Sequence, residues 1–174
     1  IQFDPQSRIN TFAHVNHTQK QNSLGLLLCI NGTGIANAWL RRTLGNSPDY
    51  PQMNDAANHA PIGSDVLRFL PFGNGAARML GNADPGATLL GLRFNNHSHQ
   101  HLCRAVQEGI VFSFCYGIEI MQAVGLNPKI IRAGKTNMFL SDLFRQTLAN
   151  ATGAKIELYD TDGSVGAARG AGIG

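Results

Sequence analysis

An α/β fold in one domain is what the sequence predicts, on three observations. The second half of the chain alternates strand-like and helix-like segments, which is typical of α/β architectures. The 174 residues are enough for a single domain with a sizeable core. Of these residues 43% are hydrophobic, only 14% are charged and 20 are glycine, so we expect elements that pack tightly or bury surface against another body.

Two strand-like segments open the chain. Residues 9–17 show partial alternation of apolar side chains and few helix formers, and residues 22–30 follow as the expected hairpin partner. A turn at residues 31–36 then leads into a helix that contains Trp39 and is stopped by Gly45.

The middle of the chain is expected to hold a short helix and a second pair of strands. Residues 48–60 are polar, and we expect a short helix there after Pro48. Short strands at 66–72 and 89–94 flank a glycine-rich loop at residues 73–87.

The longest element is a helix that Ser98 caps and that continues to about Val124, where Gly125 ends it. Its apolar residues recur at helical spacing. Two interior glycines, Gly109 and Gly117, each cost about 1 kcal/mol relative to alanine. We therefore expect the backbone of a neighbouring element to pack closely against them.

The last third of the chain supplies the alternation that defines the fold class. We expect a strand at 130–133, a helix at 141–152, a strand at 155–159 and a helix of small residues at 164–172. No repeat and no low-complexity linker interrupts this order.

Gly134, Lys135 and Thr136 look like the end of a phosphate-binding P-loop. A true P-loop needs a glycine five residues earlier so that backbone amides can surround the phosphates, and that position holds Lys129. Residues 130–132 also read as strand rather than loop. We therefore reject a P-loop and expect a turn from strand to helix.

The histidines at 97, 99 and 101 alternate, which on a strand would make a metal site conceivable. The helix signal begins at Ser98, however, and ligands on a helix need a spacing of three or four residues. We interpret these histidines as polar residues at a helix N-terminus and expect no metal site.

Charge and hydrophobicity argue against two classes of partner. Lys and Arg outnumber Asp and Glu by 14 to 11 without a basic run, so nucleic acid is not an expected partner. No apolar run reaches transmembrane length and the start is no signal peptide, so we expect no membrane binding. The first residue is Ile1 rather than Met, and we expect a chain that begins in the middle of a longer protein.

Three cysteines, Cys29, Cys103 and Cys115, are widely spaced among apolar residues. This pattern indicates buried, reduced thiols rather than a disulfide framework, and a cytoplasmic protein. Burial raises the pKa of a thiol, so none of the three is expected to act as a nucleophile.

The order of the motifs resembles the C-terminal domain of the FGGY carbohydrate kinases, and among them the xylulokinases. The pieces that carry the resemblance, in chain order, are Phe12-Ala13-His14, Trp39-Leu40, Phe69-Leu70-Pro71 with Gly73 and Gly75, Gly91-Leu92, Arg104-Ala105-Val106-Gln107-Glu108-Gly109, Gly134, Arg145-Gln146 with Leu148-Ala149, and Gly166-Ala167-Ala168. The resemblance covers nearly the whole chain. It implies a ribonuclease-H-like domain of the actin/hexokinase type, a mixed sheet with helices on both faces.

The resemblance also implies an ATP site. The turn at Ala133, Gly134 and Lys135 would cradle adenine and ribose, and a side chain at Gly134 would fill the space for the purine. Asn137 would hydrogen-bond the adenine edge, because an amide donates and accepts together. Gly34, at a helix start where amides favour an anion, would lie near the phosphates.

Two departures from the family pattern weaken particular contacts. Xylulokinases often have three glycines at this turn, where the present chain has Ala133, Gly134 and Lys135. A Gly-Glu-Arg loop of the family is replaced by Ala76-Ala77-Arg78, so the glutamate is lost.

The implied activity is ATP-dependent phosphorylation of D-xylulose to D-xylulose 5-phosphate, with Mg²⁺ bridging the phosphates. The resemblance places the catalytic base and most sugar contacts in an N-terminal domain, so we assign no catalytic residue and no metal ligand here. Residues 1–174 are expected to be the nucleotide-facing half of a two-domain kinase, inactive alone. Another sugar or polyol kinase of the superfamily, such as glycerol kinase or ribulokinase, a non-catalytic ATP-binding module, and assembly as a homodimer stay open.

Overall fold

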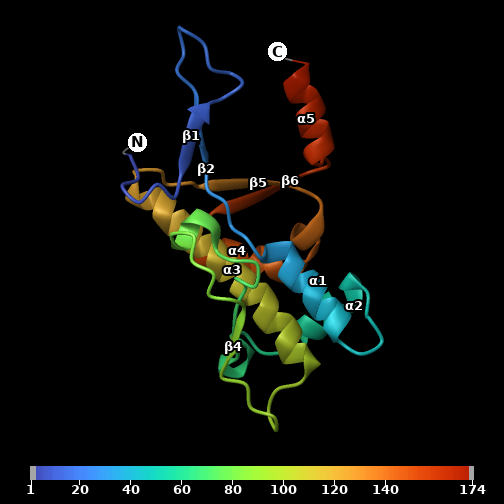
Figure 1. Cartoon of the computed structure of the whole chain (residues 1–174). Helices are drawn as coiled ribbons and strands as arrows, with labels where there is room; N and C mark the ends of the chain where they lie inside the picture. Colours follow the sequence, from blue (N-terminus) through green and yellow to red (C-terminus); the bar gives the residue numbers. More distant parts are fainter. Residues whose placement is uncertain (1–2, 173–174) are drawn as a thin grey trace.

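One long helix, α3 (His99–Ala123), runs through the middle of the molecule in the computed structural model, which describes residues 3–172 (Figure 1). Several other elements pack against it. They include α1 (Thr33–Thr43), α2 (Tyr50–Asn58), β3 (Arg68–Leu70) and α4 (Asp142–Thr152). The molecule is therefore a mixed α/β domain, as predicted.

The sequence explains where α3 begins and ends. The Ser98 side chain accepts a hydrogen bond from the Gln100 amide at 3.3 Å, and the His101 ring accepts one from the Ser98 amide at 3.1 Å. These two bonds form a capping box at the first turn. The helix stops before Gly125, whose φ of 87° is left-handed. The predicted bounds are thus confirmed to within one residue at each end.

Gly109 lies where α3 crosses β3. A Cβ atom at Gly109 would be 2.1 Å from the Phe69 carbonyl oxygen, so the expected close backbone neighbour is confirmed. At Gly117 the same atom would meet the side chains of Leu28 and Ile30 at 2.8 and 3.0 Å. There the neighbour is side chain, and the expectation of a backbone neighbour is wrong.

The strands form three separate two-stranded sheets within residues 3–172. The hairpin β1 (Asn10–Ala13) and β2 (Leu24–Leu27) is antiparallel, as are β3 and β4 (Thr88–Leu90). The pair β5 (Ile130–Gly134) and β6 (Lys155–Tyr159) is parallel, because α4 provides the crossover between them.

The expected single mixed sheet is therefore wrong for the described residues. Pairing stays between strands that are joined by one hairpin, loop or crossover, and β1 is not paired with β5. The four strands of the first half are also shorter than predicted, with three or four residues each.

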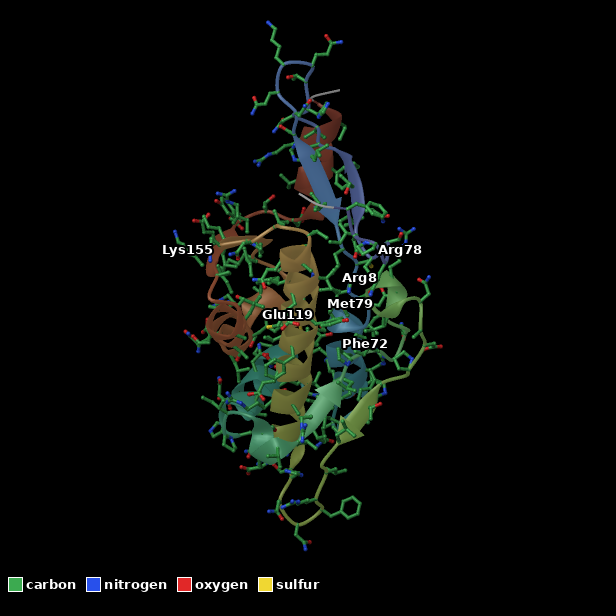
Figure 2. The ribbon with its side chains drawn as sticks, turned by 90° about the vertical axis from the view of Figure 1, so that its left-hand side faces the viewer. Arg8, Phe72, Arg78, Met79, Glu119 and Lys155 are labelled. Atoms are coloured by element: carbon green, nitrogen blue, oxygen red, sulfur yellow. The ribbon has the colours of Figure 1, made fainter. Side chains whose placement is uncertain are left out.

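The hydrophobic core has two parts, both against α3. The larger part joins α1, α2, β3 and α4 to α3, and its fully buried large side chains include Leu40, Met53, Ile110 and Phe144. The smaller part holds Phe72, Ala76, Met79 and Ile120, the last of which lies in the C-terminal part of α3. Figure 2 shows Phe72 and Met79 beside this helix. None of the helices in residues 3–172 is both long and apolar enough to cross a membrane.

The thiols differ in exposure. Cys103 is buried and Cys115 is half-buried, and burial raises the pKa of both, that of Cys103 to about 11. Cys29 is exposed in the segment between β2 and α1. The expectation of three buried thiols is therefore wrong for Cys29, which follows a short strand in which no residue is fully buried.

At one end of the molecule the β1–β2 hairpin and α5 (Gly163–Ala171) project away from the core (Figure 1). Helix α5 has no buried residue among those described. Its first turn is capped by Asp162, which accepts a hydrogen bond from the Val165 amide at 3.0 Å. That bond lowers the pKa of the Asp162 carboxyl.

Candidate functional site

A pocket of about 370 Å³ lies between α1, α2 and the segment that joins β5 to α4. Helix α1 contributes Gly34 and Asn37, and α2 contributes Asn54. Asn137 and Ser141 come from the segment between β5 and α4. Three parts of the chain that are far apart in sequence thus meet around one space.

The first turn of α1 forms one wall of this pocket. Gly32 precedes the helix with a left-handed φ of 83°, and no side chain caps the first turn. A Cβ atom at Gly32 would overlap the Pro71 carbonyl oxygen, so only glycine fits there. The first turn contains no acidic residue, and its amides and the helix dipole favour an anion.

The structure brings together two of the five residues predicted to bind ATP. Gly34 and Asn137 line the same pocket. Ala133, Gly134 and Lys135 lie at the end of β5, outside the residues that line it. Their predicted contacts with the nucleotide stay predictions.

The end of β5 is held by the segment that follows β6. A Cβ atom at Gly134 would be 2.4 Å from the Thr161 carbonyl oxygen. The Lys135 amide donates to the Tyr159 carbonyl at 2.9 Å, while the Lys135 side chain is exposed. The neighbouring backbone is therefore sufficient reason for glycine at 134, whether or not a purine lies beside it.

Asn137 begins a short 3-10 turn, Asn137–Leu140, with a left-handed φ of 51°. Asparagine tolerates this conformation better than most residues. The turn leads to Ser141, which caps α4 by accepting a hydrogen bond from the Phe144 amide at 3.2 Å. The left-handed conformation of Asn137 and the cap formed by Ser141 thus determine the path of the chain along this side of the pocket.

Sequence reasoning missed Asn37. On α1 it is buried between Ala36 and Leu40, and only 6% of its surface is exposed. Its Oδ1 atom has no hydrogen-bond partner among the described residues. The sequence did contain a signal for Asn37, because it is a polar residue on the face of α1 that its apolar neighbours predict to be buried.

Sequence reasoning also missed a buried polar chain beneath the pocket. Gln107, on α3, is fully buried. Its Oε1 atom accepts from the Ser141 hydroxyl at 2.7 Å, and its Nε2 donates to Asn54 Oδ1 at 3.0 Å. Gln107 therefore ties α2 to the start of α4, two walls of the pocket.

The histidines lie at the start of α3, as expected. His101 takes part in the capping box, and its Nε2 lies 3.2 Å from Asp65 Oδ2. Residues 3–172 contain no group of three or more His, Cys, Asp or Glu placed to hold a metal ion. His97 and His101 serve the helix end and the turn that Asp65 belongs to.

A buried ion pair supports the same end of α3. The guanidinium of Arg104 donates to the Glu108 carboxylate at 2.7 Å and to the Ala60 carbonyl at 2.9 Å. Glu108 also accepts from the Gly63 amide at 3.1 Å. Both charges are satisfied by protein groups, so the pair acts in structure rather than in binding.

The family model for the C-terminal domain of the FGGY family of carbohydrate kinases matches residues 4–173. The chain belongs to this family. The match takes in all three parts of the chain that line the pocket, and the resemblance inferred from the motifs is confirmed.

Individual relatives agree with the family. The xylulose kinase of Haemophilus influenzae is 29% identical over 144 residues, which cover 81% of this chain and 28% of that protein. The crystal structure of ligand-bound xylulose kinase from Lactobacillus acidophilus is similar over 100% of this chain and 35% of its own, with a TM-score of 0.78 and 25% identity. The structure of gluconate kinase from the same organism has a TM-score of 0.75 and 27% identity, over 99% of this chain and 35% of its own.

The chain therefore spans about a third of the length of the relatives it matches. What the chain shares with them is the C-terminal domain of a carbohydrate kinase family.

Proposed function

We propose that the chain is the nucleotide-binding half of an ATP-dependent sugar kinase, of ribonuclease-H-like architecture, that converts D-xylulose to D-xylulose 5-phosphate in the cytoplasm. The observation that carries the proposal is the pocket in which Gly34 and Asn137 meet. The xylulose kinases among the relatives support the choice of sugar.

In this proposal the start of α1 holds the phosphates of ATP, which supplies the phosphoryl group. The first-turn amides point along the helix axis, and apart from the local backbone of α1 itself no atom of residues 3–172 lies within 4 Å of where the Cβ of Gly34 would be. An anion can therefore approach the backbone closely. Asn137 holds the base, and Ala133, Gly134 and Lys135 form the rim.

Mg²⁺ and the sugar need groups from elsewhere. No cluster of metal-ligating side chains occurs in residues 3–172, so these residues offer no complete ligand set for the ion. We propose that the ion is held through the nucleotide phosphates and by carboxylates of another domain. The catalytic base and most sugar contacts are placed in that domain too.

Kinetics with a panel of sugars tests the proposal. The full-length protein would be supplied with ATP, Mg²⁺ and D-xylulose, L-xylulose, D-ribulose, D-gluconate or glycerol, and ADP release would be followed. We expect the highest kcat/KM with D-xylulose. Asn137→Ala should raise the KM for ATP about 5- to 150-fold, the equivalent of about 1–3 kcal/mol for an unpaired buried edge.

A preference for another sugar would overturn the choice of D-xylulose and leave the kinase assignment in place. The gluconate kinase structure makes D-gluconate the specific rival, because its identity to this chain is as high as that of the xylulose kinase structure. Failure to bind ATP in a calorimetric titration would overturn the nucleotide-binding role itself.

A further inference from the structure

The two strands of the β1–β2 hairpin have no core of their own. All four residues of β1 are exposed, and none of the four residues of β2 is fully buried. The hairpin projects from the molecule, and Figure 1 shows it standing apart from α5. A two-stranded hairpin is marginally stable in water unless a third strand or a packed face supports it. This hairpin therefore needs a neighbour that residues 3–172 do not supply.

The hydrogen bonds of the hairpin show which backbone groups of β1 are unused. The His14 amide donates to the Ser23 carbonyl at 3.0 Å, so these two residues form a hydrogen-bonded pair. Bonded and non-bonded pairs alternate along an antiparallel ladder, so Thr11 and Ala13 belong to non-bonded pairs. Their amides and carbonyls point away from β2, and none of these groups has a hydrogen-bond partner among residues 3–172. Thr11 and Ala13 thus present donors and acceptors at the spacing of a β-ladder.

The edge of β1 also lacks the features that keep an edge unpaired. Open edges of natural sheets are usually blunted by lysine, proline or a bulge. The sequence of β1 is Asn-Thr-Phe-Ala, and its register with β2 contains no bulge. On β2 the outward groups belong to Leu24 and Leu26, but the two central residues of that strand are half-buried, whereas β1 is exposed throughout. The structure therefore favours β1 as the edge that takes a further strand.

We infer that β1 pairs along this edge with an extended segment of the same polypeptide that lies outside these 174 residues. The chain spans about a third of the length of its relatives, and a segment of the same polypeptide is present at a high effective concentration. The backbone of this segment bonds to Thr11 and Ala13, and one of its apolar or β-branched side chains lies beside Phe12. Phe12 is 49% exposed, and its ring lies against Gly25 of β2, so its other side is open to the added strand.

This inference goes beyond the proposed function, because it involves neither the nucleotide pocket nor the sugar. Residue-resolved amide hydrogen exchange of the full-length protein tests it. Thr11 faces Leu26 and Ala13 faces Leu24 in the hairpin, and the amides of each pair point to opposite edges. Relative to their intrinsic rates, the amides of Thr11 and Ala13 should exchange at least about a hundredfold more slowly than those of Leu24 and Leu26. Exchange at β1 then requires the added strand to separate, whereas the edge of β2 stays open.

Ala13→Pro and Leu24→Pro form a matched pair of variants. Each removes one outward amide and fixes φ in the same way, and Leu24 is 52% exposed, so its side chain loses little packing. Proline is tolerated on an edge strand where the missing N–H would face solvent. We therefore expect Ala13→Pro to lower the melting temperature of the full-length protein by about 5 °C and Leu24→Pro to leave it nearly unchanged. If Ala13→Pro does not fold, the exchange rates of the wild-type protein still decide.

Similar exchange at the two edges of the hairpin would overturn the inference. Protection of Leu24 and Leu26 with free exchange at Thr11 and Ala13 would overturn it too, as would equal melting temperatures for the two variants. The other source of a strand is a second copy of the protein, which sedimentation and exchange at several concentrations distinguish. Protection at β1 that disappears on dilution to the monomer would overturn the inference, and protection that persists in the monomer would support it.

Discussion

Gly109→Ala adds one methyl group at the point where α3 crosses β3. In the structure the added Cβ would lie 2.1 Å from the Phe69 carbonyl oxygen and 3.0 Å from the carbonyl carbon. These are backbone atoms, which cannot relieve the overlap by changing rotamer as a flexible side chain can. Helix and strand would have to move apart until the contact is acceptable.

The size of the effect follows from that geometry. Ordinary contact begins at 3.4 Å, so the separation must grow by about 1.3 Å, the difference between 3.4 and 2.1 Å. Phe69, which is only 5% exposed, would move with the strand and loosen its packing in the larger core. Overpacking costs about 1–3 kcal/mol, and a contact this close with backbone atoms puts Gly109→Ala at the upper end, about 3 kcal/mol; the better helix propensity of alanine returns about 1 kcal/mol.

We therefore expect Gly109→Ala to lower the free energy of unfolding by about 2 kcal/mol, which is about 4–8 °C in melting temperature for a domain of this size. Circular dichroism during heating measures this directly. Gly166→Ala in the exposed helix α5 is the control, since beyond the local backbone of α5 no atom of the described residues lies within 4 Å of its added Cβ. It should leave the melting temperature unchanged or slightly higher. A Gly109→Ala protein as stable as the wild type would refute the close approach of β3.

Three further predictions concern stability and reactivity. The Arg8 guanidinium lowers the pKa of Asp4 from 3.8 to about 2, so the ionised carboxyl stabilises the fold above pH 4 and this stabilisation is lost as pH falls toward 2. Urea unfolding across that range should show the free energy of unfolding falling with pH, and Asp4→Asn should remove this dependence. With a thiol-specific reagent, exposed Cys29 should react first and Cys103, with a pKa of about 11, only on unfolding; equal rates would contradict the structure. Ser141→Ala should cost about 1–2 kcal/mol in chemical unfolding, because it removes both the α4 cap and the bond to buried Gln107 Oε1, and an unchanged midpoint would show that neither bond is important.

Elements set by local chemistry could be predicted from the sequence. The bounds of α3 follow from Ser98 at one end and Gly125 at the other, and β6 was predicted at its observed residues. Pairing between strands could not be predicted in the same way. It depends on which edges meet in space, and the chain gives β1 and β5 different partners although both are short.

Only some residues of the candidate site could be inferred from the sequence, because the others are recognised by their position in space. Gly34 and Asn137 were inferred from a resemblance that orders motifs along the chain, and the structure places both at one pocket. Asn37 and Gln107 carry no motif, and their importance depends on burial. A polar residue in a helix is ordinary until packing shows that it faces the interior.

A glycine in a sequence can indicate that another group packs closely against the backbone, but it does not identify that group. At position 32 the approaching group is the Pro71 carbonyl, and at position 134 it is the Thr161 carbonyl, 27 residues further along the chain. Protein atoms therefore account for both of these missing side chains. Gly34 differs, because beyond the local backbone of α1 no atom of the described residues lies within 4 Å of its Cβ position and the space beside it is the pocket. Of these three glycines, Gly34 is the one that the protein's own packing leaves unexplained, and a phosphate at the uncapped start of α1 would supply the missing neighbour.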